Sequence, residues 1–213
     1  MDDRIMHDRA DRVRCASSDR GVTLVELLVV VSLLSVVMAT AYLLQGSASA
    51  MSDQIEARAT AYEESRKAVD RITRELRQAV EITDLGGAVE RAQPPHIGFY
   101  SDVNNDGAPE LVEYDGQTGS LVRSVFDPTT VVPPYTYRSS ASTSSVVIES
   151  LGSHDIFTYY DRADPPHLIV PGHKEDVSAV SLHLINSATV NGSTASVDVA
   201  TWVKIRSILN SVN

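Results

Sequence analysis

The strongest pattern in the sequence is an apolar run near the N-terminus. From Val22 to Leu44 the only charged residue is Glu26. A helix that spans a bilayer needs about 20 apolar residues, each of which adds about 1.5 Å of length, so this run is long enough to cross a membrane. A carboxylate in hydrocarbon costs on the order of a few kcal/mol. We therefore expect Glu26 to have a function; the alternative is a charge tolerated near the interface.

A second pattern follows the apolar run and continues the same helix. Between Val22 and about Thr83 there is no proline, and the only glycine is Gly46, which favours one long helix. Beyond Ser52, apolar residues recur at spacings of three, four and seven, as on one face of a helix. This predicted stripe consists of Ile55, Ala59, Tyr62, Val69, Ile72, Leu76 and Val80. We divide the helix into a membrane and assembly half, 22–45, and an amphipathic half, 46–84.

The remainder of the chain, 85–213, has the patterns of a β domain. Leu85-Gly86-Gly87 is a helix stop, and the segments after it alternate with a period of two or are rich in β-branched and aromatic residues. Asn191-Gly192 is a strong hairpin turn signal. The predicted strands are 97–102, 110–115, 120–126, 145–150, 156–160, 177–187 and 195–206. The predicted fold class is therefore α+β, with the long helix packed on an antiparallel β-sheet.

Composition and charge narrow the organisation and the partners. At 213 residues and 43% hydrophobic content, the chain can form one modest soluble domain beside the helix. Residues 1–21 hold five acidic and five basic residues, so the net charge of −10 does not depend on them. This acidic balance argues against nucleic acid or anionic lipid as the main partner. Cys15, the only cysteine, precedes the apolar run, so no disulfide is expected after it.

The start of the apolar run resembles the processing site of type IV prepilins. The resemblance rests on Gly21, directly before the run, and on Glu26, five positions beyond it. It implies that prepilin peptidase removes residues 1–21 after Gly21 and that Val22 is then N-methylated. Phenylalanine is the usual residue where this chain has Val22. An uncleaved signal anchor is the alternative interpretation.

The same resemblance implies a role in assembly for Glu26. In type IV pilins and pseudopilins, the corresponding glutamate is thought to pair with the terminal amine of a neighbouring subunit. A buried ion pair costs less than either charge alone, and a partner in the next subunit sets the axial register. The expected fold is then type IV pilin-like.

Looser motifs narrow the resemblance to W-type minor pilins and J-type minor pseudopilins. They are distributed along most of the chain, in the helix and in several predicted strands. The motifs are the helical segment 64–72, Phe99-Tyr100-Ser101-Asp102, Leu121-Val122-Arg123, Phe157-Thr158-Tyr159-Tyr160-Asp161 and Val203-Lys204-Ile205-Arg206.

One acidic segment fits a calcium loop pattern, D-x-[DN]-x-[DN]-G-x5-E. The candidate ligands are the side chains of Asp102, Asn104, Asp106 and Glu113 and the carbonyl of Ala108. The flanks read as strands where an EF-hand has helices, and Pro109 lies within the loop. The alternative is therefore a hairpin whose Asx turns and left-handed glycine need this composition without an ion. We favour the turn, and no cofactor is expected to be required.

The remaining candidates do not indicate an enzyme. His154, His167 and His173 lie among aspartates but lack the tight spacing of a metal site, and no phosphate loop, dinucleotide fingerprint or nucleophile elbow is present. The leading hypothesis is a minor pilin or pseudopilin in the cytoplasmic membrane, with the C-terminal domain outside and later in a periplasmic or extracellular filament. Its expected partners are prepilin peptidase, other subunits and the membrane. The alternatives are a tip adhesin or DNA-uptake pilin and a membrane-tethered hydrolase.

Overall fold

The computed structural model describes residues 23–117, 119–152, 154–163, 166–169, 173–205 and 208–209. Gly21 and Val22 lie outside this part of the chain. The first element, α1, runs from Leu24 to Arg77. The chain divides into two compact units, Met1–Ser47 and Ala48–Asn213, which are described separately below.

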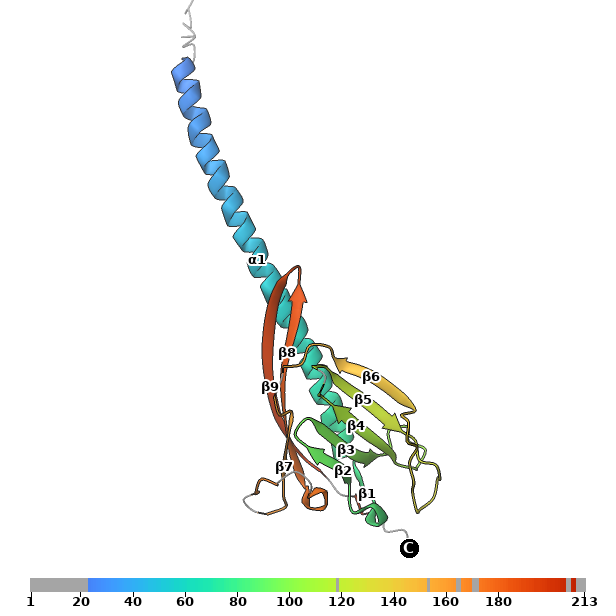
Figure 1. Ribbon diagram of the computed structural model, residues 1–213. Coiled ribbons are helices and arrows are strands. Elements are labelled where there is room, and N and C mark those ends of the chain that lie inside the picture. The colour runs from blue at the N-terminus through green and yellow to red at the C-terminus, as the bar shows by residue number, and fades with distance from the viewer. Residues whose placement is uncertain are drawn as a thin grey trace, which may run out of the picture. The chain divides into compact units, whose positions relative to one another are not determined.

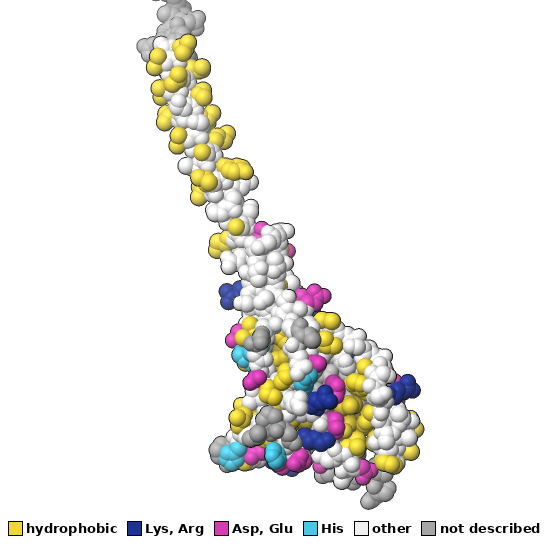
Figure 2. Space-filling model, in the orientation of Figure 1, with side chains coloured by type: hydrophobic (Ala, Val, Ile, Leu, Met, Phe, Trp, Pro, Cys, Tyr) yellow, Lys and Arg dark blue, Asp and Glu magenta, His cyan; other side chains and the backbone are white. Residues whose placement is uncertain are grey.

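The described part of the first unit is the apolar segment of α1. Every side chain from Thr23 to Ser47 is exposed, and Figure 2 shows hydrophobic side chains along this part of the helix. By length and composition, α1 is the one helix among the described residues that could cross a membrane. A surface that is apolar on all sides is stable only when lipid or other apolar helices cover it.

In the second unit, the buried face of α1 only partly matches the predicted stripe. The buried positions recur at spacings of four and three and are Ala57, Ala61, Ser65, Ala68, Ile72 and Leu76. The prediction was right for Ile72 and Leu76, but Ile55 and Tyr62 are 61% and 54% exposed. The buried face carries small residues, which let a strand approach the helix closely: the Nδ2 of Asn186 donates to the carbonyl of Ala61 at 3.1 Å.

The end of α1 also differs from the prediction. The helix stops at Arg77, before the predicted boundary at residue 84. Strand β1 (Val80–Glu81) follows and pairs in parallel with β10 (Ile208–Leu209), so Val80 is not part of the helical stripe. The 3-10 helix η1 (Thr83–Leu85) ends at Gly86 in the left-handed conformation. Ile82 and Gly87 exchange backbone hydrogen bonds of 3.1 and 3.2 Å, a bridge that a continued helix could not form.

A five-stranded antiparallel sheet contains four of the predicted strands. Its order follows the sequence, and each strand pairs with its successor. The strands are β2 (Val89–Gln93), β3 (His96–Ser101), β4 (Glu110–Asp115), β5 (Leu121–Phe126) and β6 (Thr143–Ile148). Strand β2 was not predicted.

A second antiparallel sheet contains β7 (Phe157–Tyr160), β8 (Ala179–Val190) and β9 (Ser193–Lys204). Val190 pairs with Ser193, so the turn between β8 and β9 has two residues, Asn191 and Gly192, both with positive φ. The predicted hairpin is thus confirmed. In Figure 1, β8 and β9 run beside the second part of α1, and β2 to β6 form a separate layer.

The α+β class is confirmed, with one difference in its sheets. Two antiparallel sheets and a short parallel pair take the place of the single sheet that was predicted. One cluster of buried side chains joins the buried face of α1 to both antiparallel sheets. The loop between β3 and β4 lies at the end of the larger sheet, and its position is fixed by these strands.

Candidate functional site

Thr23 positions Glu26 at the start of α1. The Glu26 N–H donates to the Oγ1 of Thr23 at 3.2 Å, and the Leu27 N–H donates to the carbonyl of Thr23 at 3.1 Å. Thr23 is therefore the N-cap, and a glutamate three residues later completes the spacing of a capping box. A carboxylate in the first turn also interacts favourably with the helix dipole. This local role was not predicted, although its signal, Thr-x-x-Glu, is present in the sequence.

The Glu26 carboxylate has no partner in the part of the chain that the structure describes. It is exposed on an apolar helix, and no ion pair or side-chain hydrogen bond within the described residues involves it. Gly21 and Val22, the predicted processing residues, lie outside the described residues. An unpaired carboxylate on an apolar surface is available to a group on another molecule.

The acidic segment between β3 and β4 folds into a series of side-chain-capped turns. The two carboxylate oxygens of Asp102 accept from the backbone N–H groups of Asp106, at 3.1 Å, and Gly107, at 3.0 Å. The Oδ1 of Asn104 also accepts from the Asp106 N–H, and the Oδ1 of Asp106 accepts from the N–H of Ala108. Gly107 has a φ of +91°. These are Asx-turn hydrogen bonds, and the acidic side chains converge on the loop's own backbone.

The structure brings Glu110, not Glu113, to the other two acidic side chains. Carboxylate oxygens of Asp102, Asp106 and Glu110 lie within 4.8 Å of one another. Glu113 lies 3.8 Å from Arg91 instead. The physical reason is that the loop leads into a strand. In β4 the even-numbered residues are buried and the odd-numbered ones are not, so Glu113 points away from the face that carries Glu110.

Glu110 is an unusual member of this group because it is only 1% exposed. Its Oε2 accepts from the N–H of Val103 at 2.9 Å, which aims the carboxylate at the loop. Its Oε1 is buried and has no hydrogen-bond partner among the described residues. Burial raises the pKa of Glu110; the hydrogen bond from Val103 opposes this shift, and the nearby charges of Asp106 and Asp102 add to it.

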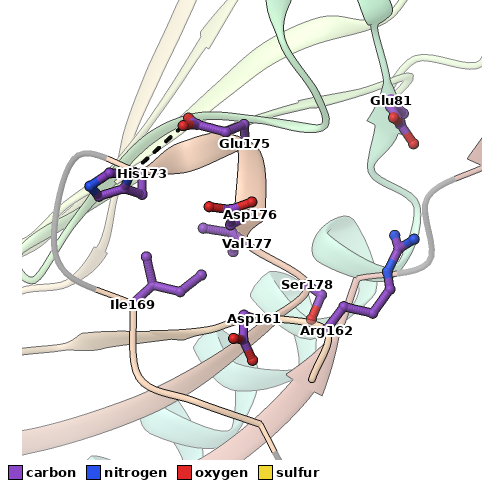
Figure 3. Close-up of a pocket in the computed structure, with 9 residues that line it drawn as sticks. All are labelled: Glu81, Asp161, Arg162, Ile169, His173, Glu175, Asp176, Val177 and Ser178. Carbon is purple, nitrogen blue, oxygen red and sulfur yellow. Dashed lines mark ion pairs between the residues drawn. The ribbon is translucent and has the colours of Figure 1, made fainter. Parts of the chain in front are cut away.

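The three candidate histidines have different partners in the described structure. His167 Nδ1 is 3.2 Å from Asp161, His173 Nδ1 is 3.8 Å from Glu175, and His154 contacts two backbone carbonyls. Figure 3 shows His173, Glu175 and Asp176 at a pocket that Asp161 and Arg162 also line. The first three could hold a cation, but all of them are exposed. Among the described residues, nothing besides this exposed cluster indicates a bound ligand at the pocket.

Comparison with known proteins bears on the N-terminal segment. Residues 16–42 match the family model for the prokaryotic N-terminal methylation motif, and the match includes Gly21, Val22 and Glu26. No curated protein and no solved structure matched the chain. The prepilin-type motif, followed by one long N-terminal helix packed on antiparallel sheets, supports the resemblance to the type IV pilin and pseudopilin superfamily.

Proposed function

We propose that this chain is a minor pilin or pseudopilin that prepilin peptidase cleaves between Gly21 and Val22 and that assembles through α1 into a filament. One observation carries the proposal: the methylation motif at 16–42 covers the start of an exposed apolar helix whose single carboxylate has no partner among the described residues. The motif is that of a structural subunit, so the proposal assigns no catalytic residue.

The exposed apolar helix supports membrane insertion followed by packing between subunits. Its side chains are exposed from Leu24 to Leu44. Burial of apolar surface stabilises by roughly 25 cal/mol per Å², so such a helix partitions into lipid or against similar helices. We propose the cytoplasmic membrane as the first location, with one crossing and the β domain outside.

The position of Glu26 supports pairing with a specific group of a neighbouring subunit when the helices pack together. A lone carboxylate in an apolar environment is costly, and a positive charge from another subunit offsets most of this cost. Cleavage before Val22 creates an amine at the same end of the helix. Pairing of that amine with Glu26 of a neighbouring subunit fixes how far the two helices are offset along the filament.

The proposal as a minor subunit rests on the resemblance to W-type and J-type proteins. The segments that carry this resemblance include Leu121-Val122-Arg123 in β5 and Phe157-Thr158-Tyr159-Tyr160 in β7. Both are paired strands in the described structure.

Processing is tested by intact-mass analysis of the protein from membranes of cells with and without the peptidase. We expect the mature chain to begin at Val22, with one added methyl group, only when the peptidase is present. A chain that keeps residues 1–21 in both strains would overturn the processing proposal.

Assembly is tested with Glu26→Gln, which removes the charge and keeps the shape of the side chain. We expect normal membrane insertion but a loss of filaments, measured by cross-linking of subunits or by shearing filaments from the cells. Glu56→Gln is the matched control, because Glu56 is an exposed carboxylate on the same helix. If filaments form equally from both variants, Glu26 does not pair between subunits.

A further inference from the structure

At the end of the loop between β3 and β4, the carboxyl group of Glu110 is buried and only partly hydrogen-bonded within the described residues. Glu110 is 1% exposed, and its Oε1 has no hydrogen-bond partner among the described residues. Within the described residues, no lysine or arginine forms an ion pair with Asp102, Asp106 or Glu110. A buried carboxylate without a positive partner is strongly destabilising unless a proton or a cation accompanies it.

The surroundings of Glu110 favour a cation over a proton. Two further carboxylates place oxygens within 4.8 Å of the Glu110 carboxylate, and a single proton neutralises only one of the three charges. Arg71 and Arg74 line a nearby hollow with Val103 and Asn105 and supply positive charge to the region, but without an ion pair to the three acids. The most direct neutralisation is a cation held between the carboxylates.

We propose that Asp102, Asp106 and Glu110 bind one calcium ion in the loop between β3 and β4. Calcium takes oxygen ligands at about 2.3–2.6 Å, so two of its ligands are separated by about 5.2 Å at most. The three carboxylates meet this limit. Each oxygen has more than one lone pair, so the Asx-turn hydrogen bonds of Asp102 and Asp106 leave capacity for an ion.

The proposal changes the ligand set that the spacing alone suggested. Glu110 takes the place of Glu113, because the alternation of β4 puts Glu110 on the loop side. The side-chain oxygen of Asn104 and the carbonyl of Ala108 remain the groups that would complete the shell. Ion binding then fixes the connection between the two strands without any residue of the N-terminal motif, so the inference is independent of the proposed function.

The test is calcium titration of the full-length protein in detergent micelles, after treatment with a chelator and its removal. Calorimetry should give one calcium per chain. At a hundredfold excess over the dissociation constant, the melting temperature should rise by about 5–10 °C. Terbium should bind in the same place and be sensitised by Tyr137, whose hydroxyl donates to the loop carbonyl of Pro109 at 2.9 Å.

Three variants make the test specific. Glu110→Gln replaces the buried carboxyl group by an amide of nearly the same volume. Asp106→Asn makes the same replacement at an exposed residue of the loop, where misfolding is a smaller risk. Each should weaken calcium binding at least tenfold. Glu113→Gln is the matched control and should bind as the unaltered protein does.

Several results would overturn the proposal. Absence of heat and of a melting shift at millimolar calcium would show that the loop is only a turn. Unchanged calcium affinity in both Glu110→Gln and Asp106→Asn would place the ion elsewhere. Equal affinity for magnesium, which prefers shorter and more rigid coordination, would reject the assignment of the ion as calcium.

Discussion

Glu75 of α1 and Arg123 of β5 form an ion pair that joins the helix to the larger sheet. The Arg123 Nη2 lies 2.9 Å from the Oε1 of Glu75, and its Nε donates to the Oε2 at 3.0 Å. The hydroxyl of Tyr114 in β4 donates to the same Oε2 at 2.7 Å. Both charged side chains are only 13% exposed. One helical carboxylate therefore contacts two neighbouring strands.

Removal of one member of this pair should destabilise the fold strongly. Arg123→Met leaves Glu75 mostly buried without its cation, and we expect a loss of about 3–5 kcal/mol in the free energy of unfolding. The measurement is urea unfolding of the full-length protein in micelles. Lys67→Met is the control, because it removes an exposed pair with Glu63 and should change the stability little. A similar effect of both substitutions would show that burial does not strengthen the pair.

Local patterns predicted the elements of the fold well. Period-two alternation located β4, and Asn191-Gly192 located the turn of the second sheet, because both signals depend only on neighbouring residues. The buried face of α1 was only partly found. A hydrophobic pattern favours Ile55 and Tyr62, whereas close approach of β8 selects small residues such as Ala57 and Ala61. The close approach of β8 decides which face of α1 is buried, and the sequence of the helix alone does not contain this information.

The candidate sites also divide into residues that a local signal reveals and residues that depend on distant parts of the chain. Glu26 could be found from the sequence, since a lone carboxylate in an apolar run is a local signal. Glu110 was missed because the calcium pattern assumes that a helix follows the loop. In a helix the twelfth residue of the pattern, here Glu113, faces the ion, whereas in a strand it faces away. The Glu75 and Arg123 pair joins residues 48 positions apart, and no spacing rule links them.

The face of α1 can be tested with a pair of equivalent substitutions. Ile72 is fully buried, and Ile55 is 61% exposed on the same helix. Ile72→Ala should lower the free energy of unfolding by about 2–5 kcal/mol through lost burial and a cavity. Ile55→Ala should stay within about 0.5 kcal/mol. Chemical unfolding of both variants measures the difference. Equally large effects of the two substitutions would restore the face predicted from the sequence, because that face contains both residues.

The hairpin turn should depend on the backbone of Gly192. Its φ is +84°, and a Cβ at this position would meet no atom within 4 Å, so any cost of Gly192→Ala comes from the backbone alone. We expect a loss of roughly 1 kcal/mol, measured by thermal unfolding. Asn191→Gly is the control, because glycine accepts the positive φ there and should change stability by no more than about 0.5 kcal/mol. Equal stability of Gly192→Ala and the unaltered protein would contradict the left-handed turn.

Tyr114 should make the fold sensitive to alkaline pH. Burial, and then the charge and hydrogen bonding of Glu75, raise the pKa of Tyr114 above its usual value. The unfolded chain has the ordinary tyrosine pKa of about 10. Above that pH the unfolded state releases a proton that the folded state keeps, so stability is fully present below about pH 10 and is lost as the pH rises towards the folded pKa.

Each such tyrosine contributes a slope of up to about 1.4 kcal/mol per pH unit above pH 10. We expect Tyr114→Phe to be less stable at neutral pH, because Glu75 loses a donor, but to lose stability less steeply with rising pH. Urea unfolding at a series of pH values measures the slope, and tyrosinate absorbance should increase together with unfolding. An unchanged slope in Tyr114→Phe would show that this hydroxyl ionises as readily in the folded protein as in the unfolded chain.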